Sequence, residues 1–126
     1  MKISTLMVIN AVISIVFGIA FAVLPAQVVS LYGATAEAPL KYTGQLFGAA
    51  LITFAILTWS ARNAADSEAR RAIVLALFIG HGIGFIVSLI GQISGVVNTL
   101  GWSTVVIYLF LSLGFGYFQF AKSASS

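Results

Sequence analysis

Charge is scarce in this sequence. Among its 126 residues there are 6 Lys and Arg and 3 Asp and Glu, so that 7% of the chain is charged and 60% is hydrophobic. Soluble domains contain about 25% charged residues, and the basic residues here form no stripe that could follow a nucleic-acid backbone. The composition therefore excludes a soluble globular domain, a disordered segment and a nucleic-acid-binding module.

Cysteine is absent, which excludes disulfides, thiolate metal sites and thiol nucleophiles. The 3 carboxylates all lie between the long apolar runs, and this position argues against a metal hydrolase. The sequence also lacks a recognisable nucleophile–base pair and a Gly-rich phosphate loop. We therefore expect no catalytic residues and no metal site built from several side chains, and we expect that the protein is not an enzyme.

Four long apolar runs make up most of the chain. They cover about residues 3–24, 43–60, 72–94 and 101–121, and none contains Asp, Glu, Lys or Arg. About 20 residues at 1.5 Å per residue cross the hydrocarbon core of a bilayer, where only helices or closed barrels satisfy their own backbone. Because the alternation of a barrel strand is missing, the sequence predicts an all-α membrane protein. Short links predict one domain, residues 1–126, folded as a four-helix up-down-up-down bundle.

The basic residues lie mostly on one side of these runs. Five of the six fall before the first run, between the second and third, or after the fourth, and they are Lys2, Arg62, Arg70, Arg71 and Lys122. Only Lys41 lies on the opposite side. Since cytoplasmic loops are enriched in Lys and Arg, both termini are predicted to be cytoplasmic. Trp59 and Trp102, at the inner and outer ends of their runs, fit the aromatic belts of the two interfaces.

Two segments allow more than one interpretation. Residues 1–26 have the basic start and apolar run of a secretory signal peptide, but the run is longer than the usual ~7–15 residues, so we expect it to remain as the first span. The longest connection, residues 26–42, either lies on the membrane surface as a short interfacial segment or simply spans the helix ends. We favour the simple connection.

Small residues form a regular pattern in the third run. They recur every three or four positions, within an arc of roughly 80° at ~100° per residue, and they are Gly80, Gly84, Ser88, Gly91 and Gly95. The second run adds Gly44 and Gly48. Small residues let transmembrane helices approach closely, so we predict helix packing at these positions. The partner helix belongs either to the same bundle, which we favour, or to a second copy or another protein.

His81 is the single histidine of the chain, and it lies roughly 13–14 Å into the third run, near the membrane midplane. Asn10, Tyr108 and Ser112 are predicted at similar depth, so these three and His81 are candidates for a ligand-binding cluster. One interpretation is hydrogen bonding between helices. The other is a site at which His81 relays a proton, binds a small polar ligand or ligates the metal of a tetrapyrrole. No cofactor is assigned.

The layout resembles small four-helix bacterial inner-membrane proteins such as the DoxX-like family. The resemblance covers the whole chain as architecture, in length, helix count and the short Arg-bearing link from Trp59-Ser60-Ala61-Arg62 to Arg70-Arg71. It implies a location in the cell inner membrane. The size is also similar to that of small multidrug transporters, whose hallmark is an acidic residue in the first helix, where this chain has Asn10. No functional residue is carried over from either family.

These observations lead to two functional hypotheses. The first is a small multi-pass membrane protein without catalytic machinery, a structural or accessory subunit that packs in the lipid bilayer with itself, as a homo-oligomer, or with a larger membrane complex. The alternative is a bundle that binds a small molecule, a proton or a cofactor at a midplane site around His81.

Overall fold

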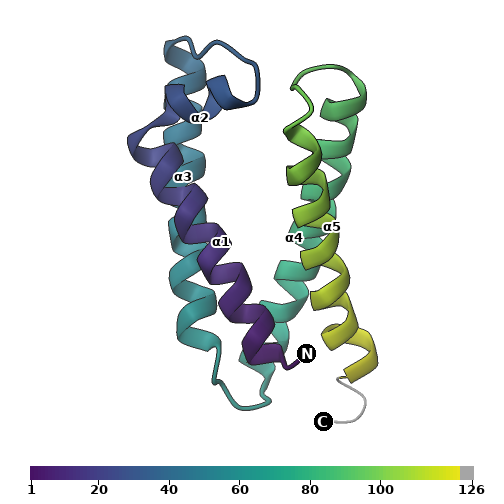
Figure 1. The fold of residues 1–126 in the computed structure, drawn as a ribbon. Coiled ribbons are helices and arrows are strands. Elements are labelled where there is room, and N and C mark those ends of the chain that lie inside the picture. The colour runs from purple at the N-terminus through teal and green to yellow at the C-terminus, as the bar shows by residue number, and fades with distance from the viewer. Residues whose placement is uncertain (123–126) are drawn as a thin grey trace. The chain divides into compact units, whose positions relative to one another are not determined.

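A computed structural model describes residues 1–122, and helices are the only regular secondary structure within that range. The helices are α1 (Ile3–Val23), α2 (Pro25–Leu31), α3 (Ala38–Ala61), α4 (Glu68–Ile93) and α5 (Gly101–Gly116), followed by a π-helical segment, η1 (Tyr117–Lys122) (Figure 1). The predicted all-α class is confirmed.

Four helical segments are long and apolar enough to cross a membrane, namely α1, α3, α4 and the continuous stretch Gly101–Ala121. Large hydrophobic side chains are exposed on each of them, and examples are Val16, Ile56, Val87 and Leu113. Extended apolar surface of this kind marks contact with a membrane or a partner. The predicted number of spans and their approximate positions are confirmed.

The helix bounds differ from the predicted spans mainly where α3 and α4 begin. These helices begin at Ala38 and Glu68, whereas the apolar runs predicted starts near residues 43 and 72. The predicted runs begin after the last charged residue, whereas each helix extends further toward its N-terminus and includes charged residues, Lys41 in α3 and Glu68, Arg70 and Arg71 in α4. In α4 the Ser67 side chain caps the first turn by accepting a hydrogen bond of 3.2 Å from the Arg70 amide, which satisfies an amide without a helical partner. At the other end of the chain, the predicted fourth helix changes from α to π geometry after Gly116.

The contacts within the described chain group into two compact units, one of residues 7–62 and the other of residues 1–6 together with residues 63–122. The division falls within α1. The first unit contains α1 and α3 as an antiparallel pair with α2, and the second contains α4 and α5 as an antiparallel pair (Figure 1). The arrangement of all four spans as one bundle stays a prediction.

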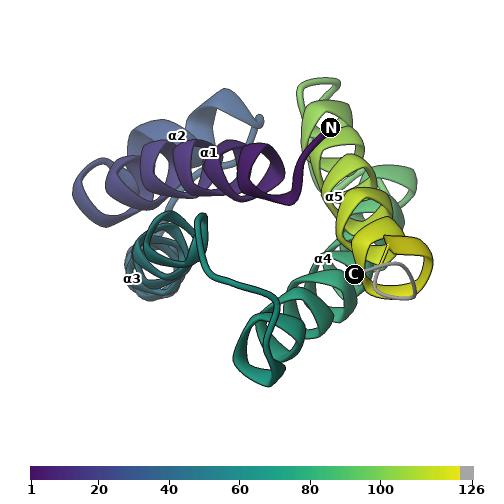
Figure 2. The ribbon, with the colours of Figure 1, turned by 90° about the horizontal axis from the view of Figure 1, so that it is seen from below.

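In the unit of residues 7–62, α1 is inclined to α3 (Figure 2), and Gly18 of α1 lies close to Gly48 of α3. A Cβ atom added to Gly48 would lie 2.6 Å from the Gly18 carbonyl oxygen and 2.7 Å from the Ala22 amide nitrogen. Real Cβ atoms do not approach backbone atoms so closely, so the two helices touch through their backbones. This contact supports the packing role predicted for Gly48, and Gly44 adds a looser contact with Phe21 and Pro25.

The connection that was expected simply to span the helix ends contains a helix instead. Pro25 ends α1 as predicted, but it also begins α2, a helix of 7 residues. The fixed φ of proline suits the first position of a helix, where no amide donor is required. The chain then turns at Gly33, whose φ of 84° lies in the left-handed region. Residues 25–31 therefore form an ordered segment that packs against the start of α3.

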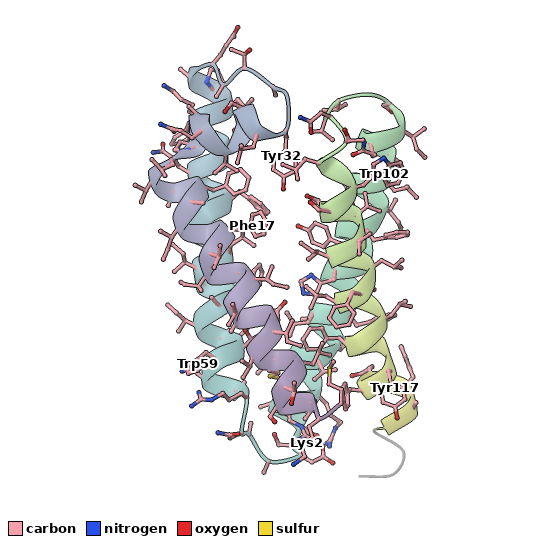
Figure 3. The ribbon with its side chains drawn as sticks, viewed as in Figure 1. Lys2, Phe17, Tyr32, Trp59, Trp102 and Tyr117 are labelled. Carbon is pink, nitrogen blue, oxygen red and sulfur yellow. The ribbon has the colours of Figure 1, made fainter. Side chains whose placement is uncertain are left out.

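Aromatic side chains lie near both ends of each unit. Tyr32 and Trp59 lie at opposite ends of the unit built on α1 and α3, and Trp102 and Tyr117 lie at opposite ends of the other helical pair (Figure 3). Tyr and Trp rings are enriched at both membrane–water interfaces. The spacing of these four rings is therefore compatible with helices that cross a bilayer.

Candidate functional site

His81 lies at the middle of α4, between its first residue Glu68 and its last residue Ile93. Its ring is close to two aromatic rings of α5, with centroids 5.8 Å apart for Tyr108 and 5.9 Å apart for Phe115. The Phe115 ring is inclined by 30° to the imidazole, whereas the Tyr108 ring is tilted by 50°. The only histidine of the chain is therefore packed between α4 and α5, where an aromatic neighbour covers part of its surface.

Glycines of α4 make room for the side chains that surround His81. A Cβ atom added to Gly84 would overlap the Tyr108 ring, and one added to Gly82 would lie 3.3 Å from the Ser112 hydroxyl oxygen. The absence of these two side chains lets Tyr108 and Ser112 lie against the α4 backbone. The space beside Gly82 and Gly84 is thus filled by side chains of α5.

Ser112 of α5 is hydrogen-bonded to α4 one helical turn before His81. Its hydroxyl donates a hydrogen bond of 3.3 Å to the carbonyl oxygen of Phe78, and the residue is only 8% exposed. The carbonyl belongs to the helical turn that leads to His81. His81, from the third predicted span, and Tyr108 and Ser112, both from the fourth, therefore do lie together at one level of the pair formed by α4 and α5.

Asn10, the fourth candidate, lies in the other unit and has a partner there. Its Nδ2 donates a hydrogen bond of 3.3 Å to the Thr58 hydroxyl oxygen, and both residues are fully buried. The Thr58 hydroxyl in turn donates a hydrogen bond of 2.8 Å to the carbonyl oxygen of Phe54. A residue that sequence reasoning missed thus holds the amide of Asn10. The signal was the spacing of Thr58 from Gly44 and Gly48, which places all three on one face of a helix.

The predicted small-residue face of α4 divides into a packed part and an open part. Gly84 packs against Tyr108, but within its unit no atom lies within 4 Å of a Cβ added to Gly80 or Gly91. Gly95 follows the end of α4 and has a φ of 75°, so its role is to turn the chain. Ser88 is partly buried and donates its hydroxyl hydrogen to the carbonyl oxygen of Phe85 at 3.1 Å.

Two further glycines, Gly101 and Gly116, have packing roles in the pair formed by α4 and α5. A Cβ atom added to Gly116 would lie 2.8 Å from the Phe78 ring, and one added to Gly101 would overlap the Gln92 and Val97 side chains. Both glycines lie at the ends of α5. Gly116 follows Ser112 at the four-residue spacing of small residues on one helix face, whereas Gly101 belongs to no such pattern and is revealed only by the packing.

The chemistry available around His81 is that of neutral hydrogen-bonding groups. Imidazole, phenol and hydroxyl groups can donate and accept hydrogen bonds. Among residues 1–122 no group of three or more His, Cys, Asp or Glu side chains is arranged to hold a metal ion. The arrangement can therefore bind a small polar molecule or pass a proton, but the described side chains form no multidentate metal site.

Four apolar helices and a sparse set of charged residues define a small multi-helix protein with the character of a membrane-embedded chain. The model of one family, described as a domain of unknown function (DUF8292), matches residues 1–118, and the chain belongs to this family. A search of curated proteins and a search of solved structures found no match. The family match names neither the DoxX-like proteins nor the small multidrug transporters, so the resemblance to DoxX-like proteins stays a prediction.

Proposed function

We propose that this chain is a small multi-pass protein of the bacterial inner membrane that acts as a structural or accessory subunit, without catalytic machinery. It would act by packing its helices against a second copy or against a larger membrane complex. The observation that carries this proposal is the open face of α4 around Gly80, Val87 and Gly91. At ~100° per residue these three positions share one face, and the two glycines have nothing packed on them within their unit.

This open face has the properties of a helix-docking surface in a membrane. Glycines allow the backbone of another helix to approach closely, and such contacts stabilise helix pairs through van der Waals packing. Val87 between them is 64% exposed. An incoming helix, from this chain or from a partner, would cover the glycines and bury the valine.

The test is native mass spectrometry of protein released from membranes in mild detergent. The wild-type chain is expected in a complex with itself or with a larger partner, and Gly80→Leu is expected to release it as a monomer. Because a Cβ atom added at position 80 would have open space around it, this variant should keep its helical fold by circular dichroism. A wild-type chain that is monomeric, or a Gly80→Leu complex of unchanged mass, would contradict the proposal.

The proposed orientation places both termini and the link between α3 and α4 in the cytoplasm. It is supported by the arginines of that link, because basic residues are enriched in cytoplasmic loops. A fluorescent protein fused to the C-terminus should be fluorescent, whereas periplasmic alkaline phosphatase at the same position should be inactive. An active phosphatase fusion would contradict this orientation.

A second function, a midplane binding site around His81, is favoured by one specific observation. The imidazole lies halfway along a spanning helix beside a phenol and a phenyl ring, and intramembrane ionisable residues often mark functional sites. Native mass spectra should then show a small bound molecule that is lost in His81→Phe, a change that keeps the aromatic packing. If wild type and His81→Phe carry the same bound mass, His81 is a packing residue.

A further inference from the structure

A groove lies between α1 and α3 in the unit of residues 7–62. Its volume is about 290 Å³. Two small buried residues, Ala11 and Ala55, form its floor, and larger apolar side chains that include Val12, Ile56 and Trp59 form its sides. The two alanines leave open a space between the helices that longer side chains would have filled.

The groove is suited to a single hydrocarbon chain. Its lining is almost entirely apolar, and its volume is close to the lower end of the range of about 300–1,000 Å³ found for small-molecule pockets. It lies between two membrane-spanning helices, where acyl chains are the surrounding solvent. Val12, Ile56 and Trp59 are each at least half exposed along it, so a chain can enter from the side.

A cation lies where the groove reaches the end of α3. Arg62 follows Ala61, the last residue of this helix, and its Nη1 donates a hydrogen bond to the Trp59 carbonyl oxygen. The guanidinium carbon lies 4.1 Å from the centre of the Trp59 ring, a distance typical of cation–π contacts. Two interactions therefore fix a positive charge beside the indole that forms one side of the groove.

The charge of Arg62 has no carboxylate to balance it within its unit. The only acidic residue among positions 7–62 is Glu37, which precedes α3 at the opposite end of that helix. Arg70 and Arg71, by contrast, are both within ion-pair distance of Asp66. A guanidinium has five N–H donors in a planar fork that matches the geometry of phosphate oxygens, so Arg62 complements an anionic headgroup.

We infer that the groove and Arg62 together bind one anionic glycerophospholipid. One acyl chain lies along Ala11 and Ala55, and the phosphate lies against the Arg62 guanidinium at the membrane surface. The net negative charge of the headgroup, which zwitterionic lipids lack, selects the ligand. This inference rests on the membrane embedding of the proposed function, but it does not depend on the role as a subunit.

The fluorescence of Trp59 can report an occupied groove directly. The chain has two tryptophans, so in a Trp102→Phe background all indole emission comes from the groove. This protein is reconstituted into phosphatidylcholine vesicles that contain a small fraction of brominated phosphatidylglycerol or, in the matched sample, brominated phosphatidylcholine. Bromine quenches an indole that it contacts. Half-maximal quenching of Trp59 is expected at about a fivefold lower mole fraction of the anionic lipid, because one basic residue attracts anionic lipid by about this factor.

Three variants separate specific binding from ordinary contact with lipid. Arg62→Gln is expected to abolish the preference for the anionic lipid while leaving quenching by brominated phosphatidylcholine unchanged. Val12→Phe should fill the groove and abolish the preference as well. Val16→Phe, at an exposed position one turn further along α1 and outside the groove, should retain it. In a Trp59→Phe background, Trp102 should be quenched equally by both lipids.

Equal quenching of Trp59 by the two lipids, or a preference that persists in Arg62→Gln, would overturn the proposed lipid site. Flotation of the vesicles on a density gradient distinguishes this failure from failure of the proposed function. Protein that floats with the vesicles but shows no preference contradicts the lipid site alone. Protein that does not float contradicts membrane embedding, and with it both proposals.

Discussion

The two helical pairs of this protein use glycine in different ways. Between α1 and α3, Gly48 faces the Gly18 carbonyl oxygen and the Ala22 amide, so backbone meets backbone. Between α4 and α5, Gly84 faces the ring of Tyr108, and Gly116 faces the ring of Phe78. The first contact brings two helix axes close together, whereas the second creates a recess that an aromatic side chain fills.

This difference determines how each pair can respond to change. A backbone atom can move only if its helix moves, but an aromatic ring can rotate or shift within its recess. The pair formed by α1 and α3 should therefore be rigid and sensitive to substitution. The pair formed by α4 and α5 should be more tolerant, and it is the pair that carries His81 and the open glycine face.

The largest effect is expected for Gly48→Ala. The added methyl group would lie 2.6 Å from the Gly18 carbonyl oxygen, so α1 and α3 must separate. Overpacking of this kind costs about 1–3 kcal/mol, and we expect the upper part of that range. Thermal unfolding in detergent measures the change. Gly91→Ala, whose added Cβ has open space around it, should keep or raise the unfolding temperature, because alanine is the better helix former. An equal effect of the two variants would remove the distinction between a packed and an open glycine.

A smaller effect is expected for Gly84→Ala, because the neighbour is the Tyr108 ring and not backbone. We expect about 1 kcal/mol, the lower end of the overpacking range. If the ring causes the loss, a double-mutant cycle with Tyr108→Leu should show coupling, because residues in contact are not additive. Additive effects within about 0.3 kcal/mol would show that the strain lies elsewhere.

The buried hydrogen bond between Asn10 and Thr58 should contribute less than either glycine contact. Hydrogen bonds between transmembrane helices average about 0.6 kcal/mol in double-mutant cycles. We expect a coupling of this size between Asn10→Ala and Thr58→Val, measured by unfolding in detergent. Absence of coupling would show that the hydrogen bond between Asn10 and Thr58 contributes nothing measurable to the free energy of unfolding.

The smallest effect is expected for Ser112→Ala. The hydroxyl donates to the Phe78 carbonyl oxygen, but that carbonyl lies within α4 and can keep its own helical hydrogen bond. Loss of the serine therefore leaves no acceptor unsatisfied, and we expect less than about 0.6 kcal/mol. If Ser112→Ala lowers the free energy of unfolding more than Asn10→Ala does, the pair formed by α4 and α5 is not the more tolerant of the two.

The fold was largely predictable from the sequence because the four spans are recognised by their lack of charged residues. Absence of charge over about 20 residues is a long-range property that no single residue can obscure. The starts of α3 and α4 were harder to predict because they depend on caps such as Ser67, a local signal outside the apolar runs. The helix α2 was missed because 7 residues give too little periodicity to distinguish a helix from a link.

The sequence was sufficient to predict which residues lie at the candidate site, but not which side chains contact one another there. The depth of His81, Tyr108 and Ser112 in their spans indicated that they could meet, and within one helical pair they do. Sequence periodicity placed Gly80, Gly84 and Gly91 on one face, but it could not show that only Gly84 faces Tyr108. That distinction depends on where Tyr108 lies along α4, which the packing of the two helices determines.

The central claim is that the open face of α4 receives another helix, and cross-linking at two adjacent positions tests it most directly. A photo-reactive amino acid is placed at Val87, on the open face, or at Ile86, which is also exposed but about 100° around the helix. In native membranes, position 87 should give a cross-link to a second copy or to a partner protein, and Gly80→Leu should abolish it, whereas a cross-link confined to the same chain would contradict the claim. Position 86 should react with lipid alone. Equal cross-linking at both positions, or none at position 87, would contradict the claim.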